Sequence, residues 1–180
     1  MATNNFLIKS DCDAYRRKRK QLNLLIKMCW ITIGLILFFK VLASNINLYV
    51  DTQKEKCLPY TYYLFIKGVS EYKSGSIYSF ESKNIPFFKD GSRLGKILLA
   101  KEGDLITINK DGLFVNEHLI TKDTLVHAKK LNKEVSSFYT SYTIPKGKLF
   151  MYGTAPNSFD SRYYGLIDSK SLTGRLIPLW

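Results

Sequence analysis

The sequence has few residues that could hold a metal ion or close a disulfide framework. Its 180 residues include three cysteines and two histidines. His118 and His127 stand nine positions apart with no cysteine or carboxylate cluster beside them, which argues against a zinc-type site. A glycine-rich phosphate loop, internal repeats and low-complexity tracts are also absent. We therefore expect one domain with a short appendage that works without a metal or another cofactor.

Acidic residues are scarce as well, with 15 Asp and Glu against 27 Lys and Arg, a formal net charge of +12. Such an excess suits a nucleic acid, a membrane surface or an acidic partner. The densest basic cluster, YRRKRK at 15–20, directly precedes an apolar run, whereas the lysines further on are scattered. We weigh binding of single-stranded nucleic acid by charge and tyrosine stacking, and we expect no nucleic-acid partner.

The apolar run from Leu24 to Ala43 has the ~20 residues needed to cross ~30 Å of hydrocarbon. Lys27 and Lys40 interrupt it near its ends, where long side chains can reach the interface. The basic cluster before it favours a cytoplasmic N-terminus. A cleaved signal peptide and a buried core helix are the alternatives. The predicted order is a basic cytoplasmic tail over 1–22, a transmembrane helix over 23–45 and an exported domain over 46–180.

The exported part has the pattern of short strands separated by turns. A 14% aromatic share with 12 tyrosines favours β structure. The stretch GKILLAKEGDLITINKDGLFVNEHLI holds a Glu-Gly-Asp turn and an Asp-Gly turn between apolar segments, which is a strong hairpin signal. We therefore predict a mainly β, antiparallel domain, with strands over 97–100, 105–109 and 113–116.

Three further segments are less clear. The stretch after Pro145 predicts another strand, and GRLIPLW at 174–180 predicts a final one. Because proline cannot donate to a ladder, Pro178 favours an edge position for that final strand. Residues 121–138 fit either a helix or a mobile insertion, since their apolar spacing is irregular.

The cysteines separate into different compartments under this topology. Cys12 would be cytoplasmic, Cys29 would lie in the bilayer and Cys57 would be alone in the exported domain. No disulfide can join them. A single cysteine in an exported domain indicates intermolecular pairing or a reactive thiol, and an inert buried thiol is the plainer alternative.

Three motifs resemble type I signal peptidases. The stretch PKGKLFMYGTAPNSFDSRYYG at 145–165 resembles the family's C-terminal signature of Asn-Ser-x-Asp-Ser-Arg-Tyr-x-Gly. The stretch KILLAKEGD at 96–104 resembles its lysine box, with the same spacing from lysine to Gly-Asp. The stretch CLP at 57–59 stands 39 residues before Lys96, where the family places its nucleophile element. The resemblance covers most of the chain from Leu24 onward.

The resemblance implies a coiled, barrel-like antiparallel signal-peptidase domain behind one N-terminal transmembrane helix. It also implies a site in which Cys57 is the nucleophile and Lys96 the base. Ser158 would orient the Lys96 amine, and Asp160 and Arg162 would support it as a pair. Ser158 as a turn hydroxyl, and Asp160–Arg162 as a purely structural salt bridge, are the alternatives from the residues alone. A lysine base must be neutral to accept a proton, and burial among apolar side chains favours the neutral amine.

The chain departs from the family pattern at several positions. Cys57 stands where the family has serine, and Lys101-Glu102 replaces the usual Leu-Pro. The last box begins YGTAP instead of Gly-Asp-Asn. Glu55 occupies the position that often supplies an oxyanion-hole hydroxyl, which leaves the Cys57 backbone N–H as the expected donor.

Within the superfamily, the short nucleophile element and the Pro-Leu-Trp ending resemble TraF-type peptidases of conjugative plasmids. This resemblance implies processing of a membrane-inserted pilin precursor at the bacterial inner membrane, with a periplasmic catalytic domain. It also implies other membrane proteins of the conjugation apparatus as partners. Because a thioester reacts readily with amines, Cys57 favours acyl transfer that closes the pilin into a ring. A catalytically inactive membrane scaffold of a pilus or secretion assembly is the alternative.

Overall fold

The chain divides into two compact units, Met1–Ser44 and Asn45–Trp180. The computed structural model describes residues 2–52, 56–122 and 125–179, and within these ranges it describes the side chains of residue 16 and of residues 18 onward. Each unit is considered by itself.

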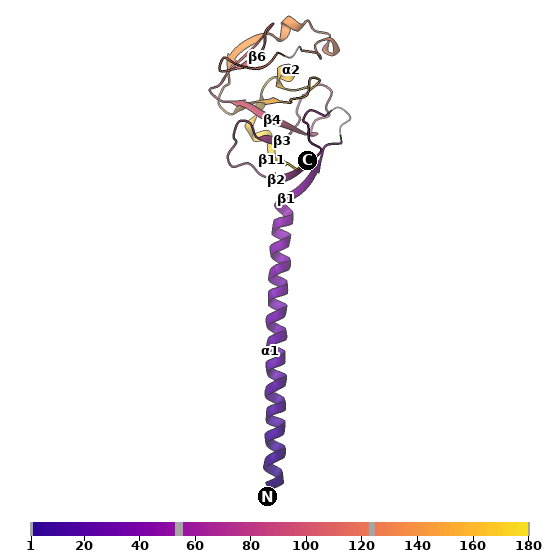
Figure 1. Ribbon diagram of the computed structural model, residues 1–180, viewed down its shortest axis with the longest axis vertical. Coiled ribbons are helices and arrows are strands. Elements are labelled where there is room, and N and C mark those ends of the chain that lie inside the picture. The colour runs from indigo at the N-terminus through magenta and orange to yellow at the C-terminus, as the bar shows by residue number, and fades with distance from the viewer. Residues whose placement is uncertain (1, 53–55, 123–124, 180) are drawn as a thin grey trace. The chain divides into compact units, whose positions relative to one another are not determined.

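The first unit is a single helix, α1 (Ala2–Asn45) (Figure 1). It ends where the predicted transmembrane segment ends but begins well before residue 23, so the basic cluster at 15–20 belongs to the same helix. An 18-residue window within Lys18–Asn45 has a mean hydropathy of 2.1, and none of its residues is buried. An apolar helix of this length can cross a bilayer, which supports membrane anchoring.

The larger sheet of the second unit is antiparallel at each described pairing, with the strand order β1-β2-β11-β3-β4-β9-β10. Its side chains alternate between the core and the opposite face, as the burial of β4 shows most clearly. Its strands are β1 (Ile46–Val50), β2 (Tyr62–Lys67), β3 (Ile77–Glu81), β4 (Arg93–Lys101), β9 (Lys148–Tyr152), β10 (Ile167–Asp168) and β11 (Leu172–Pro178).

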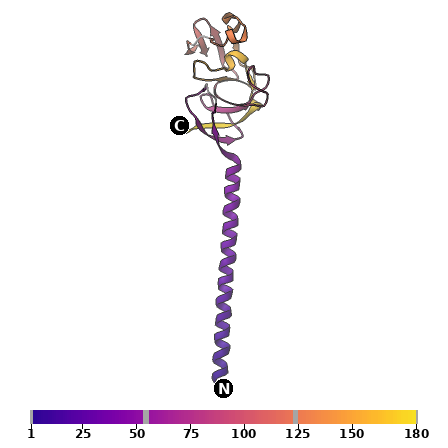
Figure 2. The ribbon, with the colours of Figure 1, turned by 90° about the vertical axis from the view of Figure 1, so that its right-hand side faces the viewer.

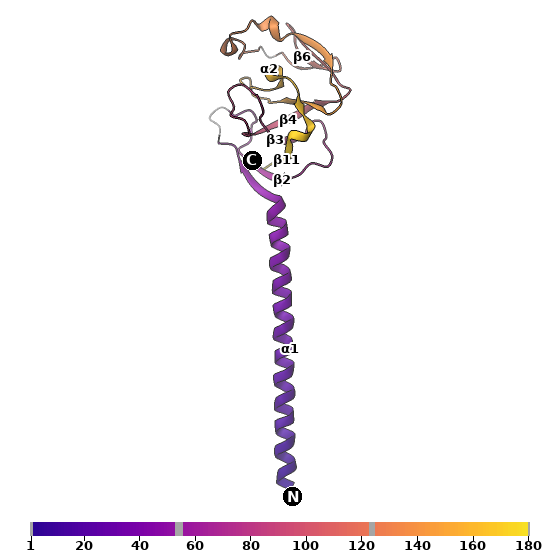
Figure 3. The ribbon, with the colours of Figure 1, turned by 180° about the vertical axis from the view of Figure 1, so that it is seen from behind.

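The smaller sheet has the strand order β7-β6-β5-β8. It is built from β5 (Leu105–Asn109), β6 (Gly112–Val115), β7 (His118–Thr121) and β8 (Thr140–Thr143). Its central hairpin pairs Asn109 with Gly112, which confirms the turn predicted at Asp111-Gly112. In Figures 1 and 3 this sheet, which carries the label β6, is separate from the strands labelled β3, β4 and β11. The prediction of a mainly β, antiparallel domain is therefore confirmed.

The last strand is not at an edge, which corrects the prediction made from Pro178. Strand β11 lies between β2 and β3, and the yellow ribbon at the C-terminus lies beside the purple strands in Figure 2. Pro178 pairs with Tyr63 of β2, whereas the pairing with β3 ends at Leu176–Ile77. The proline therefore lies beyond the end of β3, where its missing N–H breaks no ladder on that side. Trp180 lies outside the described residues.

Residues 121–138 form neither a regular helix nor a detached loop in their described part. They contain two short 3₁₀ turns, η1 (Lys129–Leu131) and η2 (Val135–Phe138). Leu125, Ala128 and Phe138 are buried in the core cluster that also holds strands of the smaller sheet. The segment is fixed by this packing, and its irregular apolar spacing reflects single residues that reach the core between turns.

Candidate active site

Strand β4 places Lys96 inside the protein. Leu94, Lys96 and Leu98 are alternate residues of this strand, and all three lie on its buried face. Lys96 is only 1% exposed. Burying an ammonium group without partners is costly, so a lysine on an apolar face points to a role that an apolar side chain could not fill.

The buried amine of Lys96 donates a hydrogen bond to the hydroxyl of Ser158. Lys96 Nζ lies 2.9 Å from Ser158 Oγ, and Ser158 is fully buried. The backbone N–H of Ser158 donates to Ala155 O at 2.9 Å, so a tight turn fixes the serine while its hydroxyl faces the lysine. This geometry favours the predicted orienting role over a hydroxyl that caps its own turn.

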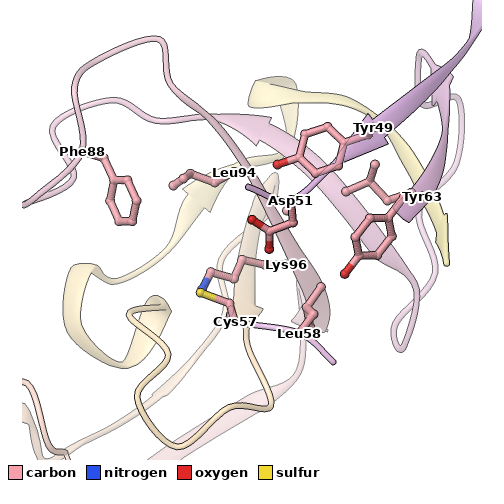
Figure 4. A pocket seen from close by; sticks show the side chains of 10 residues that line it. Tyr49, Asp51, Cys57, Leu58, Tyr63, Phe88, Leu94 and Lys96 are labelled. Atoms are coloured by element: carbon pink, nitrogen blue, oxygen red, sulfur yellow. The ribbon is translucent and has the colours of Figure 1, made fainter. Parts of the chain in front are cut away.

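Cys57 lies directly opposite Lys96. Both residues line a small cavity of about 10 Å³, and Figure 4 shows the Cys57 sulfur and the Lys96 nitrogen pointing toward one another. Cys57 is a free, partly buried thiol. Its carbonyl accepts a hydrogen bond of 3.2 Å from Ala155 N. The loop that carries Ser158 therefore also holds the backbone of Cys57.

Gly153, at the end of β9, makes this close approach possible. A Cβ placed there would lie 2.1 Å from Ser158 Oγ and 2.9 Å from Cys57 O. Both distances are shorter than any non-bonded contact allows, so only glycine leaves room for the two groups. The sequence did not reveal this role, because Gly153 lies in the YGTAP stretch where the chain departs from the family pattern.

Asp160 and Arg162 form a buried pair behind Ser158. Arg162 Nε donates to Asp160 Oδ1 at 2.8 Å, and Nη2 donates to Asp160 Oδ2 at 2.9 Å. The carboxylate also accepts from the backbone N–H groups of Gly153 and Arg162 and caps α2 (Ser161–Tyr164). Arg162 Nη2 reaches Ser158 O at 3.3 Å. The pair thus joins β9, the serine turn and α2.

Asp160 keeps the Arg162 guanidinium charged despite its burial. Burial alone would lower the pKa of the guanidinium, but hydrogen bonds to Asp160 and the Asp160 charge outweigh it and raise that pKa. The guanidinium also lies 5.0 Å from the centre of the Tyr152 ring. A bidentate, fully charged pair of this kind fixes geometry.

Asp51 is a site residue that the sequence did not reveal. It follows β1 and lines the same cavity as Cys57 and Lys96, and its carboxylate projects toward them in Figure 4. Burial, and then the Asp51 charge, raise the pKa of Tyr63. The same two causes, in the same order, raise the pKa of Tyr49. No local motif marks Asp51, because only the pairing of β1 with β2 brings it to the site.

A second, larger cavity of about 290 Å³ also reaches Cys57. It is lined by three phenylalanines, a histidine, an asparagine and a lysine: Phe87, Phe88, Phe159, His127, Asn157 and Lys130. The sequence argued against metal binding by His127 and suggested no other role for it. In the structure its Nε2 lies 2.7 Å from Asn157 O, so it braces the residue before Ser158. Among the described residues, no group of three or more His, Cys, Asp or Glu is arranged to hold a metal.

Glu55, the residue at the position of the second oxyanion donor, lies outside the described residues. The catalytic role of the Cys57 backbone N–H stays a prediction, as do the roles of the five predicted site residues. The structure does bring all five together, from three separate parts of the chain.

Comparisons with known proteins match the chain to one family. The family model for signal peptidase, peptidase S26, matches residues 22–180. The chain belongs to that family, and its class is that of the signal peptidase I-like peptidases. This confirms the resemblance to signal peptidases inferred from the motifs, whereas membership of the TraF-type group stays a prediction.

Individual relatives are distant. Signal peptidase I P of Bacillus subtilis subsp. natto is 27% identical over 172 residues, which cover 88% of this chain and 90% of that one. Signal peptidase I of Buchnera aphidicola is 35% identical over 69 residues. The match covers 38% of this chain and only a fifth of the Buchnera protein. A crystal structure of a signal peptidase I from Enterococcus faecalis has a TM-score of 0.40 at 24% identity, covering 60% of this chain and 98% of that one.

Proposed function

We propose that the chain is a membrane-anchored endopeptidase in which Cys57 is the nucleophile and Lys96 the base. One observation carries this proposal: a lysine that is 1% exposed hydrogen-bonds a buried serine and points at the only thiol of the second unit. Nucleophile and base from distant parts of the chain meet in one cavity, as covalent catalysis requires.

Cysteine suits a lysine partner well. A free thiol ionises near ~8.5 and a free lysine near ~10.4, so a thiol can give its proton to an amine without extreme tuning of either group. The Lys96 amine faces the Cys57 sulfur in the small cavity, so it is placed to accept the thiol proton. Ser158 directs the amine toward the sulfur, and the Asp160–Arg162 pair holds Ser158 in place.

The reaction proceeds through a thioester. Cys57 Sγ attacks the scissile carbonyl, the C–N bond breaks, and Lys96 passes the thiol proton to the leaving amine. Water then attacks the thioester to release an acid, or a second amine attacks it to form a new peptide bond. In either case the attacking group loses a proton to Lys96, and Sγ leaves as the thiol. The Cys57 backbone N–H stabilises the developing oxyanion.

The substrate of this proposal is a membrane-inserted pilin precursor, and the outcome is a ring formed by acyl transfer. The CLP element and the Pro-Leu-Trp ending support the conjugative, TraF-type assignment. Cysteine in place of serine supports amine transfer. Residues 46–56 separate the end of α1 from Cys57, a reach of at most roughly 40 Å, which suits a scissile bond near the bilayer.

The basic cluster before the apolar helix supports a cytoplasmic N-terminus in the inner membrane of a bacterium, with the catalytic unit in the periplasm. The lipid bilayer and other membrane proteins of the conjugation apparatus are the expected partners.

Intact-mass spectrometry of the cognate precursor tests the proposal. Wild-type protein, Cys57→Ser, Cys57→Ala and Lys96→Ala are each incubated with it. A product made by wild type but not by Cys57→Ala or Lys96→Ala is the expected result, and a mass one water below the linear product identifies the ring. If only the linear product forms, the proposed proteolysis stands and the proposed cyclisation is wrong. Equal processing by all four proteins would mean that the Cys57 thiol is a bystander. No processing by any of them, with pilus assembly unaffected by Cys57→Ala, would favour the inactive scaffold.

A further inference from the structure

Cys57 lies where two unlike cavities meet. The smaller one contains Lys96 and has a volume of about 10 Å³, whereas the larger one has a volume of about 290 Å³ and is mostly aromatic. Cys57 and Phe88 line both cavities. A peptide bond attacked at the sulfur has chain on either side of it. The two sides of the scissile bond therefore face different surroundings.

Phe87, at the rim of the larger cavity, has an unusual conformation. Its φ is +69°, in the left-handed region, where a bulky aromatic residue is rare. Its side chain is 64% exposed, although one edge meets the ring of Phe159 at a centroid distance of 5.1 Å. An exposed ring on a strained backbone gains little for folding. Strain of this kind persists mainly at sites of ligand binding and catalysis.

The part of the larger cavity's lining formed by Phe159 and His127 is held in place by its neighbours. Phe159 stacks on Tyr163 at 5.1 Å between ring centres, and His127 meets the Phe159 ring edge-on at 5.6 Å. The hydrogen bond from His127 to Asn157 O ties this part of the lining to the turn that carries Ser158. The cavity is thus a rigid aromatic surface next to the reacting sulfur, with one exposed ring at its rim.

We propose that this larger cavity binds a bulky apolar or aromatic side chain on the amine side of the scissile bond. That segment is the leaving peptide during cleavage and the incoming N-terminus during ring closure, so the inference rests on the proposed function. The acyl side occupies the small cavity beside Lys96, where there is space for only a small side chain. The larger cavity opens at the exposed Phe87, so one amine-bearing segment can leave and another can enter while the thioester stays in place.

An acyl-transfer competition with the full-length protein in detergent micelles tests this inference. The acyl donor is the benzyl thioester of acetyl-Ala-Leu-Ala, and the competing acceptors are Phe-Gly-amide and Gly-Gly-amide. Wild-type protein is expected to prefer the Phe acceptor about tenfold, because a filled apolar pocket discriminates by at least that factor. Phe87→Gly should reduce this preference toward parity, and Phe87→Tyr should retain it.

Asn84→Gly is the matched control. Asn84 belongs to the same loop and also has a positive φ, of 55°, but it does not line the larger cavity. It should keep the wild-type preference. Equal use of the two acceptors by wild type, or an unchanged preference in Phe87→Gly, would overturn the inference. Failure of the donor to form a Cys57 adduct in wild type would overturn the proposed function itself, and the adduct is read by intact mass before any acceptor is added.

Discussion

Two buried basic side chains both hydrogen-bond Ser158 in this site and are held in different ways. Arg162 is 4% exposed and forms a bidentate pair with a buried carboxylate. Lys96 is 1% exposed and hydrogen-bonds a neutral hydroxyl. A guanidinium matched to a carboxylate stays charged and fixes its surroundings. An amine that faces a hydroxyl and a thiol can gain and lose a proton. The first arrangement is suited to support and the second to catalysis.

Replacing Lys96 should give the largest loss of activity with no loss of stability. Lys96→Met keeps the length of the side chain, and loss of the base should lower the rate of precursor cleavage by about 10²–10⁴-fold. Stability should hold or rise by about 1 kcal/mol, because an apolar side chain costs nothing to bury on this face of β4. Cleavage rates and urea unfolding measure the two effects.

Lys101→Met is the control for this change, since Lys101 is an exposed residue of the same strand. It should leave the cleavage rate unchanged. A strongly destabilised Lys96→Met protein would show that Lys96 is a structural cation like Arg162, and the contrast between the two would disappear.

Replacing Gly153 should displace both Ser158 and Cys57. In Gly153→Ala the added methyl group overlaps Ser158 Oγ and presses on Cys57 O, so the nucleophile and the lysine orienter must separate. Displacement by about 1 Å is expected to lower the rate about 100-fold. Thr154→Ala changes the adjacent, exposed residue and should behave as wild type. Normal cleavage by Gly153→Ala would mean that the close approach of these groups is not needed.

Replacing Arg162 should act mainly on stability. Arg162→Ala leaves the Asp160 carboxylate buried without its guanidinium, which typically costs about 3–5 kcal/mol. The fall in the midpoint of urea unfolding measures this cost. Activity of the fraction that remains folded should fall less than in Lys96→Met. Full stability of Arg162→Ala would contradict the supporting role given to the pair.

The smallest expected effect is a loss of stability at high pH, caused by Tyr63 and Tyr164. Burial and then Asp51 raise the pKa of Tyr63, and burial and then Asp160 raise the pKa of Tyr164. Each tyrosine keeps its proton when folded and loses it when unfolded above about pH 10. Stability should therefore fall as the pH rises beyond about 10.

Comparing unfolding midpoints at about pH 8 and about pH 11 checks this, and Tyr63→Phe and Tyr164→Phe should each lessen the alkaline fall. Equal alkaline falls in wild type and in both variants would show that folding does not raise the pKa of these tyrosines.

The sequence predicted much of this molecule where the signals are local. The Asp-Gly turn of the smaller sheet and the strands on either side of it follow from residues next to one another. Cys57, Lys96 and Ser158 were brought together by their spacing within a family pattern. The prediction of an edge position for β11 was wrong because Pro178 was taken to prevent pairing along the whole strand. A proline removes the N–H donor only at its own position in the ladder.

What the sequence did not reveal depends on contacts between distant segments. Asp51 reaches the small cavity because β1 pairs with β2. His127 reaches Asn157 from a segment whose apolar spacing did not decide between a helix and a mobile insertion. The left-handed backbone at Phe87 has no signature either, since turn rules favour glycine or asparagine at such a position. Sequence patterns thus located the reacting groups, and only the fold showed what surrounds them.

The central claim is that Cys57 carries an acyl group during the reaction. The most direct measurement is an acid quench of wild-type protein with its precursor, followed by mass spectrometry of the peptide that contains Cys57. The account predicts a hydroxylamine-sensitive thioester adduct at that residue, present in wild type, absent in Cys57→Ala and lost in Lys96→Met. Cleavage by wild type without any adduct, together with equal cleavage by Cys57→Ala, would contradict it.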